Sequence, residues 1–169
     1  MMWDRVLLAL DEYESGQAAM RFTTELALVT HSDVRVLHIR ALSGWARVLP
    51  LETPAQAKDL VHEAVFALRL AGLGAEGGTC SIIEDQVALR IVEESLYWLC
   101  DAIVLGTRRL HGIGRLSGRG VREQVVRLSP LPVLAAPTPL TNAVHHPLGF
   151  RTNRLGRTDP RHTPSGENT

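Results

Sequence analysis

The feature that most constrains the fold is a regular alternation of two kinds of segment. Short apolar runs, each the length of a buried strand, are separated by longer segments in which apolar residues recur at helical spacing. The apolar runs lie at residues 2–10, 34–39, 79–83, 102–105 and 131–135. Strands that alternate with helices form a parallel sheet, and right-handed crossovers cover both of its faces. The pattern therefore predicts an α/β fold: a doubly wound, five-stranded parallel sheet with helices on both faces.

Capping and terminating residues mark the ends of the predicted helices. Ser15 and Asp85 are predicted N-caps, and Thr53-Pro54 combines an N-cap with proline at the first helical position. Gly72 and Gly74 are predicted to end the second helix, and Pro130 the fourth. The predicted apolar stripes are Ala18, Phe22, Leu26 and Val29; Ala57, Val61, Ala64 and Leu68; Ala88, Val92, Ser95 and Leu99; and Val121, Val125 and Leu128.

The composition changes near residue 137. Residues 1–137 carry all the strand and helix patterns, whereas 138–169 hold four prolines and little apolar periodicity. We therefore predict one domain over 1–137, followed by a mostly disordered, basic tail over 138–169. The tail contains four arginines against Asp159 and Glu167. Contact with an acidic partner or RNA is one reading of this charge, and a solvated extension is the one we favour.

Composition and cysteine usage exclude several function classes. Lys+Arg and Asp+Glu both number 18, so net charge indicates no partner, and we expect no specific nucleic acid. No apolar stretch approaches the ~20 residues of a membrane span, and no cleavable signal is evident. The expected compartment is the cytoplasm.

Cys80 and Cys100 form no C-x-x-C pair and have no zinc spacing, so both are interpreted as small buried hydrophobes, with no metal expected.

The fold class also predicts where a ligand binds. In doubly wound sheets, ligands occupy the crevice beyond the carboxyl ends of the strands, where the strand order reverses. This rule indicates the loops that follow Leu10, Ile39 and Leu105.

Four segments resemble the universal stress protein family over residues 3–137: Arg5–Asp11, Val36–Ile39, Asp101–Thr107 and Ser129–Leu134. The resemblance implies a Rossmann-like fold of the adenine nucleotide alpha hydrolase type, with ATP or a related adenine nucleotide as ligand. It places Asp11 near the ribose and base, and Ile39 beneath the adenine. It also implies a homodimer that pairs the apolar final strand across a two-fold axis, with Val133 and Ala135 near that axis; an unpaired apolar edge would otherwise be a liability.

The loop after the fourth strand departs from the family's phosphate-binding pattern, which reads Gly, two residues, Gly, nine residues, Gly, then Ser or Thr. Here Gly106 matches, Arg109 and Arg119 replace the next two glycines, and Gly120 replaces the hydroxyl residue. Two readings stay open: arginine charge replaces lost backbone contacts with phosphate, or Arg119 fills the phosphate pocket. The predicted binding residues are Asp11, Ile39, Gly106, Arg109, Gly112, Arg119, Gly120 and Val121.

Two functions follow, and a third has little support. The first is a stress-response regulator that binds ATP weakly in the cleft after the first and fourth strands. The second is a dimeric interaction module of the same fold that binds no nucleotide. An enzyme is not expected, because the sequence contains no Gly-x-Ser-x-Gly elbow and no pair of carboxylates with a matching histidine.

Overall fold

A computed structural model describes residues 3–11, 14–42, 52–107 and 120–137. Over these residues the chain forms one five-stranded sheet in the order β3-β2-β1-β4-β5, and every neighbouring pair is parallel. The strands are β1 (Arg5–Leu10), β2 (Asp33–Leu42), β3 (Ala75–Ile83), β4 (Ala102–Leu105) and β5 (Val133–Ala135). The predicted doubly wound α/β fold is confirmed.

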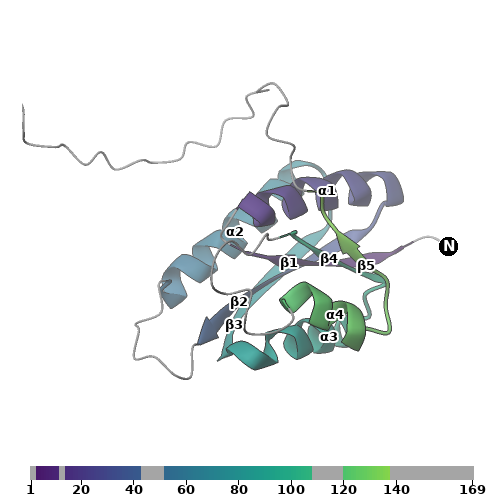
Figure 1. The fold of residues 1–169 in the computed structure, drawn as a ribbon. Coiled ribbons are helices and arrows are strands. Elements are labelled where there is room, and N and C mark those ends of the chain that lie inside the picture. The colour runs from purple at the N-terminus through teal and green to yellow at the C-terminus, as the bar shows by residue number, and fades with distance from the viewer. Residues whose placement is uncertain (1–2, 12–13, 43–51, 108–119, 138–169) are drawn as a thin grey trace, which may run out of the picture. The chain divides into compact units, whose positions relative to one another are not determined.

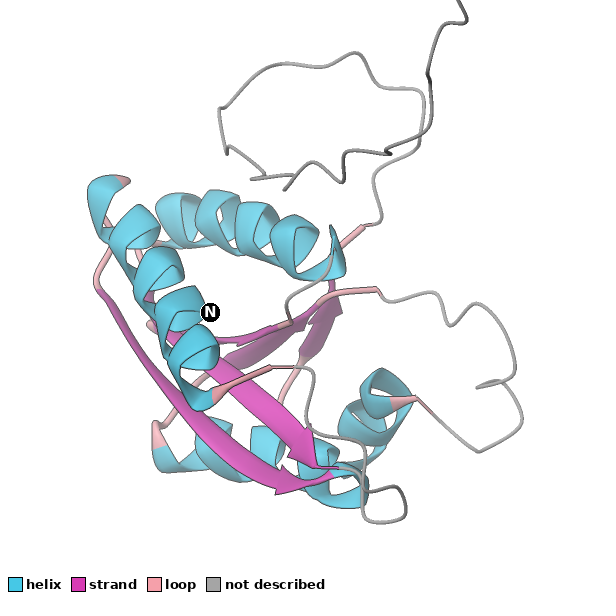
Figure 2. Cartoon of the chain, turned by 90° about the vertical axis from the view of Figure 1, so that its left-hand side faces the viewer, coloured by secondary structure: helices cyan, strands magenta, loops and turns pink. Residues whose placement is uncertain are grey.

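Helices cover both faces of the sheet, with α1 and α2 on one side and α3 and α4 on the other (Figure 1). Their bounds are α1 (Glu14–Thr30), α2 (Pro54–Leu70), α3 (Val87–Tyr97) and α4 (Val121–Leu128). Figure 2 shows the same layering from the side. Successive residues of a strand point to opposite faces, so Val6 and Leu8 pack under α1 and α2 whereas Leu7 packs under α3 and α4. All three are fully buried, as expected for a central parallel strand.

The second helix begins and ends as its sequence predicts. Thr53 and Gln56 form a capping box in which each side chain accepts a hydrogen bond from the other's backbone N–H, and Pro54 occupies the first helical position. Gly72 follows the helix with a φ of 87°, a left-handed conformation that glycine adopts without steric cost.

The other two predicted caps were wrong. Ser15 lies inside α1, and its hydroxyl donates to the Asp11 carboxylate (2.7 Å). Asp85 lies in the 3₁₀ turn Glu84–Gln86, so α3 begins two residues later, after Gln86. The second predicted stripe is buried throughout, whereas the first and third were wrong at their last positions, because Val29 is 81% exposed and Leu99, beyond the end of α3, is 73% exposed. In the fourth stripe only Val125 is buried.

Only β4 has its predicted bounds. β1 starts at Arg5 rather than at residue 2, and β2 runs on to Leu42 rather than ending at Ile39. β3 starts four residues early, at Ala75, because it pairs with β2 along the whole of Val34–Leu42. β5 starts only at Val133, after Pro132, a residue with no N–H for the ladder. Cys100 is buried as predicted, whereas Cys80 on β3 is only partly buried.

Nothing in the described part of the chain resembles a membrane span, since its helices are too short or too polar. The predicted tail, residues 138–169, lies outside the described residues, and the domain boundary stays a prediction.

Candidate functional site

The strand order reverses between β1 and β4, and the candidate site lies at their carboxyl ends. β1 pairs with β2 on one side and with β4 on the other, so the crossovers leave it in opposite directions. Ala9 is in register with Leu105, which places Leu10 and Gly106 at neighbouring positions past the last pair. The predicted residues Asp11 and Gly106 are therefore brought together from positions far apart in the sequence.

Asp11 joins the end of β1 to the start of α1. Its carboxylate accepts the Ser15 hydroxyl, one helical turn further on. A methyl group on Gly16 would collide with the Asp11 backbone carbonyl, so only glycine allows this tight turn onto the helix. Asp11 is partly exposed, and its carboxylate contacts the first turn of α1.

Gly106 packs directly against the same turn of α1. A methyl group on Gly106 would lie 2.5 Å from the Ser15 carbonyl oxygen and 2.8 Å from its Cβ. Ser15 thus contacts both predicted residues, and sequence reasoning treated it only as a helix cap. The sequence did contain a signal for the contact with Asp11, because Ser15 follows it by four residues. Since α1 begins at Glu14 rather than after Ser15, this spacing brings the two side chains within hydrogen-bond distance.

A second set of contacts holds the chain where it leaves β4. The Ala136 N–H donates to the Leu105 carbonyl (2.8 Å), and the Thr107 hydroxyl donates to the Ala136 carbonyl (2.9 Å). These bonds extend the β4–β5 pairing past the last strand residues. Gly106 is therefore held between α1 on one side and the end of β5 on the other.

α4 begins at Val121, the first residue of the predicted fourth stripe, and Gly120 directly precedes it. Gly120 is the N-cap residue and has no side chain to cap the helix, and its carbonyl accepts from Gln124. Helix N-termini attract anions through their N–H groups. The Glu123 carboxylate in this first turn pairs with Arg122, and that hydrogen bond lowers the pKa of Glu123 below its ordinary value.

Ile39 lies on β2, one residue past the Leu10–His38 register pair, at the same end of the sheet. Its side chain is half-buried and packs with the cluster under α3 and α4 that includes Leu37 and Leu105. The remaining predicted site residues, Arg109, Gly112 and Arg119, lie outside the described residues.

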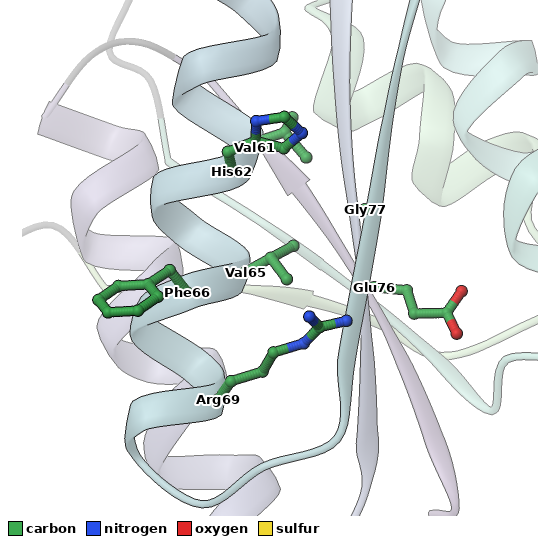
Figure 3. Close-up of a pocket in the computed structure, with 7 residues that line it drawn as sticks. All are labelled: Val61, His62, Val65, Phe66, Arg69, Glu76 and Gly77. Atoms are coloured by element: carbon green, nitrogen blue, oxygen red, sulfur yellow. The ribbon is translucent and has the colours of Figure 1, made fainter.

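Other candidate features lie elsewhere. A hollow between α2 and the amino-terminal half of β3 is lined by residues that include Val65, Arg69 and Glu76, although the Glu76 side chain points away from α2 (Figure 3). It lies at the far edge of the sheet, because β3 is an outer strand and Glu76 is its second residue. The described residues contain no group of three or more His, Cys, Asp or Glu able to hold a metal ion.

Solved structures of similar fold include several with nucleotides. A universal stress protein from Archaeoglobus fulgidus is 24% identical, with a TM-score of 0.61 over 81% of this chain and 96% of that chain. A universal stress protein in complex with cAMP is 20% identical, with a TM-score of 0.63 over 82% of this chain and 100% of that chain. The Archaeoglobus fulgidus protein in complex with dAMP is 21% identical, with a TM-score of 0.58 over 81% and 100%.

At these identities the likeness to solved structures shows the shared fold. A comparison with curated proteins gave no match. The comparison with protein families is more decisive, because the universal stress protein family matches residues 2–137 and so spans all of the strands and helices described above. The chain belongs to the universal stress protein family.

Proposed function

We propose that this chain is a cytoplasmic regulatory protein that binds an adenine nucleotide weakly beyond the carboxyl ends of β1 and β4. The observation that supports the proposal is the convergence of Asp11 and Gly106 on the first turn of α1, at the point where the strand order reverses. Relatives of the same fold have been solved with cAMP and dAMP.

Each described element has a role in this proposal. Asp11 offers a carboxylate oxygen to the ribose hydroxyls, and Ile39 offers apolar contact to the adenine. The backbone at Gly106 and the N-terminus of α4 at Gly120 offer N–H groups to the phosphates. We propose binding and regulation rather than catalysis.

Weak affinity follows from the sequence of the loop after β4. The family pattern has glycine at the position of Arg119, so we expect the arginine side chain to hinder close approach of phosphate, although its charge attracts anions at longer range. We expect a Kd for ATP of roughly tens of micromolar or weaker, equivalent to ~6 kcal/mol or less. The double variant R119G/G120S, which restores the family pattern, is expected to bind ATP at least about tenfold more tightly, ~1.4 kcal/mol.

Calorimetric titration of ATP into the full chain tests the proposal. Asp11→Asn keeps the shape of the side chain and removes its charge, so ATP affinity should fall. Asp59→Asn is the matched control, because Asp59 is an exposed carboxylate on α2 and lies outside the site. Nanomolar affinity in the wild type would overturn the steric argument. Equal affinities for Asp11→Asn and Asp59→Asn would remove Asp11 from the site.

A second candidate function, a dimeric interaction module, rests on the position of β5. Within the described sheet, β5 is an edge strand that pairs only with β4, and Val133 and Leu134 are only partly buried. Pairing β5 with its copy across a two-fold axis would cover this edge and bring Val133 and Ala135 close to the axis. Light scattering at micromolar concentration should then give the mass of a homodimer. A monomer would refute this assembly.

A further inference from the structure

His38 is a buried histidine with an acceptor facing each of its ring nitrogens. It lies near the carboxyl end of β2, in register with Leu10 on β1, and is 5% exposed. Its Nδ1 lies 2.8 Å from the Leu10 carbonyl oxygen, and its Nε2 lies 2.8 Å from Oε2 of Glu52. The Glu52 side chain is 14% exposed, so the contact is largely shielded from water.

The chemistry of these two contacts determines where the protons sit. A carbonyl oxygen only accepts, so Nδ1 must carry a hydrogen and donate it to Leu10. The second contact then needs one further proton, held by Nε2 or by the Glu52 carboxyl group, because an imidazole lone pair and a carboxylate oxygen repel each other at 2.8 Å. The ring is therefore fixed at both ends and cannot rotate without losing two buried hydrogen bonds.

Arg40 reinforces the contact from the same face of β2. Its Nη2 donates to the Glu52 backbone carbonyl (2.8 Å), and its Nη1 donates to the Ser81 hydroxyl on β3 (2.9 Å). Glu52 is thus held by its side chain and its backbone, directly before the Thr53 cap of α2. We call His38, Arg40, Glu52 and Ser81 the His38 cluster. It joins β2 and β3 to the start of α2, and the contact with the Leu10 carbonyl adds β1.

We propose that His38 is a positioning residue for Asp11. This inference rests on the proposed nucleotide-binding function. The Leu10 carbonyl belongs to the same peptide plane as the Asp11 N–H, so the bond from Nδ1 fixes the orientation of the residue whose carboxylate faces Ser15. A ligand that contacts Asp11 then meets a preorganised carboxylate, although it never touches the imidazole. The charged groups facing His38 in the described structure are Glu52 directly and Arg40 through Glu52.

Variants of His38 separate the two hydrogen bonds. His38→Leu removes both, and ATP affinity measured by calorimetry on the full chain should fall at least about tenfold. His38→Asn keeps an N–H donor near the position of Nδ1, and Glu52→Gln leaves a neutral ring that still donates to Leu10. Both of these variants should bind ATP within about threefold of the wild type, because the Leu10 contact survives.

A double-mutant cycle distinguishes positioning from a general loss of stability. If His38 acts through Asp11, His38→Leu should have little effect on ATP affinity once Asp11 is already Asn, so the two changes should not add. Additive losses, or a His38→Leu variant within twofold of the wild type, would overturn the proposal. A His38→Asn variant as weak as His38→Leu would also overturn it.

Nuclear magnetic resonance without nucleotide keeps the test independent of the proposed function. In the wild type, the ring nitrogens should show a protonated Nδ1. His38→Leu should shift the amide signals of Asp11, Ser15 and Gly16, and His38→Asn should shift them less. If the wild type binds no ATP, the proposed function fails and these spectra alone decide the positioning claim. If His38→Leu does not fold, the ring spectrum and the Asn and Gln variants decide it, and an unprotonated Nδ1 would refute it.

Discussion

Replacing Gly106 by alanine tests how closely α1 packs against the end of β4. The added methyl group would lie 2.5 Å from the Ser15 carbonyl oxygen, whereas ordinary contacts begin near 3.4 Å, so the two backbones must separate by about 1 Å. Overpacking of this kind costs about 1–3 kcal/mol. The alanine regains about 0.4–1 kcal/mol by restricting the unfolded chain. The net loss in free energy of unfolding should be about 1–2 kcal/mol, or roughly 2–8 °C in Tm.

Gly78→Ala is the matched control for this substitution. Gly78 lies on β3, has no positive φ, and its added methyl group would lie 3.2 Å from Nη2 of Arg35, a side-chain atom that needs to give by only a few tenths of an ångström. Urea unfolding of both variants should show Gly78→Ala near the wild type and Gly106→Ala less stable by at least about 1 kcal/mol. If the two variants are equally stable, the packing of Gly106 against Ser15 is not as close as the structure shows, and the steric account of this end of the site is wrong.

Two further predictions concern buried groups on the face of the sheet that α3 and α4 cover. Glu94 is 6% exposed and pairs with Arg35 (3.0 Å) and Arg90 (2.8 Å), so Glu94→Gln should lower the free energy of unfolding by about 3 kcal/mol. Glu93→Gln is the control, because it removes an exposed partner of Arg90. Measured by urea unfolding, it should lower the free energy of unfolding by less than about 1 kcal/mol. Equal losses for the two variants would contradict the claim that burial makes the Glu94 pairs the stronger ones. Burial raises the pKa of the Cys100 thiol from 9.0 to about 11, so the native state keeps a proton that the unfolded chain releases above pH 9. Stability should therefore fall by roughly 2–3 kcal/mol between pH 9 and 11, and Cys100→Ala should remove that part of the pH dependence.

Much of the fold could be predicted from local pattern. The apolar runs correctly located the strands, because a strand buried on both faces needs apolar residues at nearly every position, as Val6, Leu7 and Leu8 show. Thr53 and Pro54 correctly marked the start of α2, because a capping box involves only residues close in sequence. Asp11 and Gly106 could be assigned to the same end of the sheet, because parallel strands that alternate with helices all have their carboxyl ends on one side.

The tertiary structure decided which side chains meet. Ser15 contacts Gly106, His38 bonds to Leu10 and Glu52, and Arg35 pairs with Glu94, and none of these contacts has a signature in the spacing of the residues. Such contacts depend on the register between strands and on the first residue of each helix. A shift of one residue in a strand turns its side chains to the other face, and a shift in a helix turns them by about 100°. The sequence pattern therefore determined the layers of helices and sheet and the end of the strands at which the site lies, whereas the register between distant segments determined the geometry of the site itself.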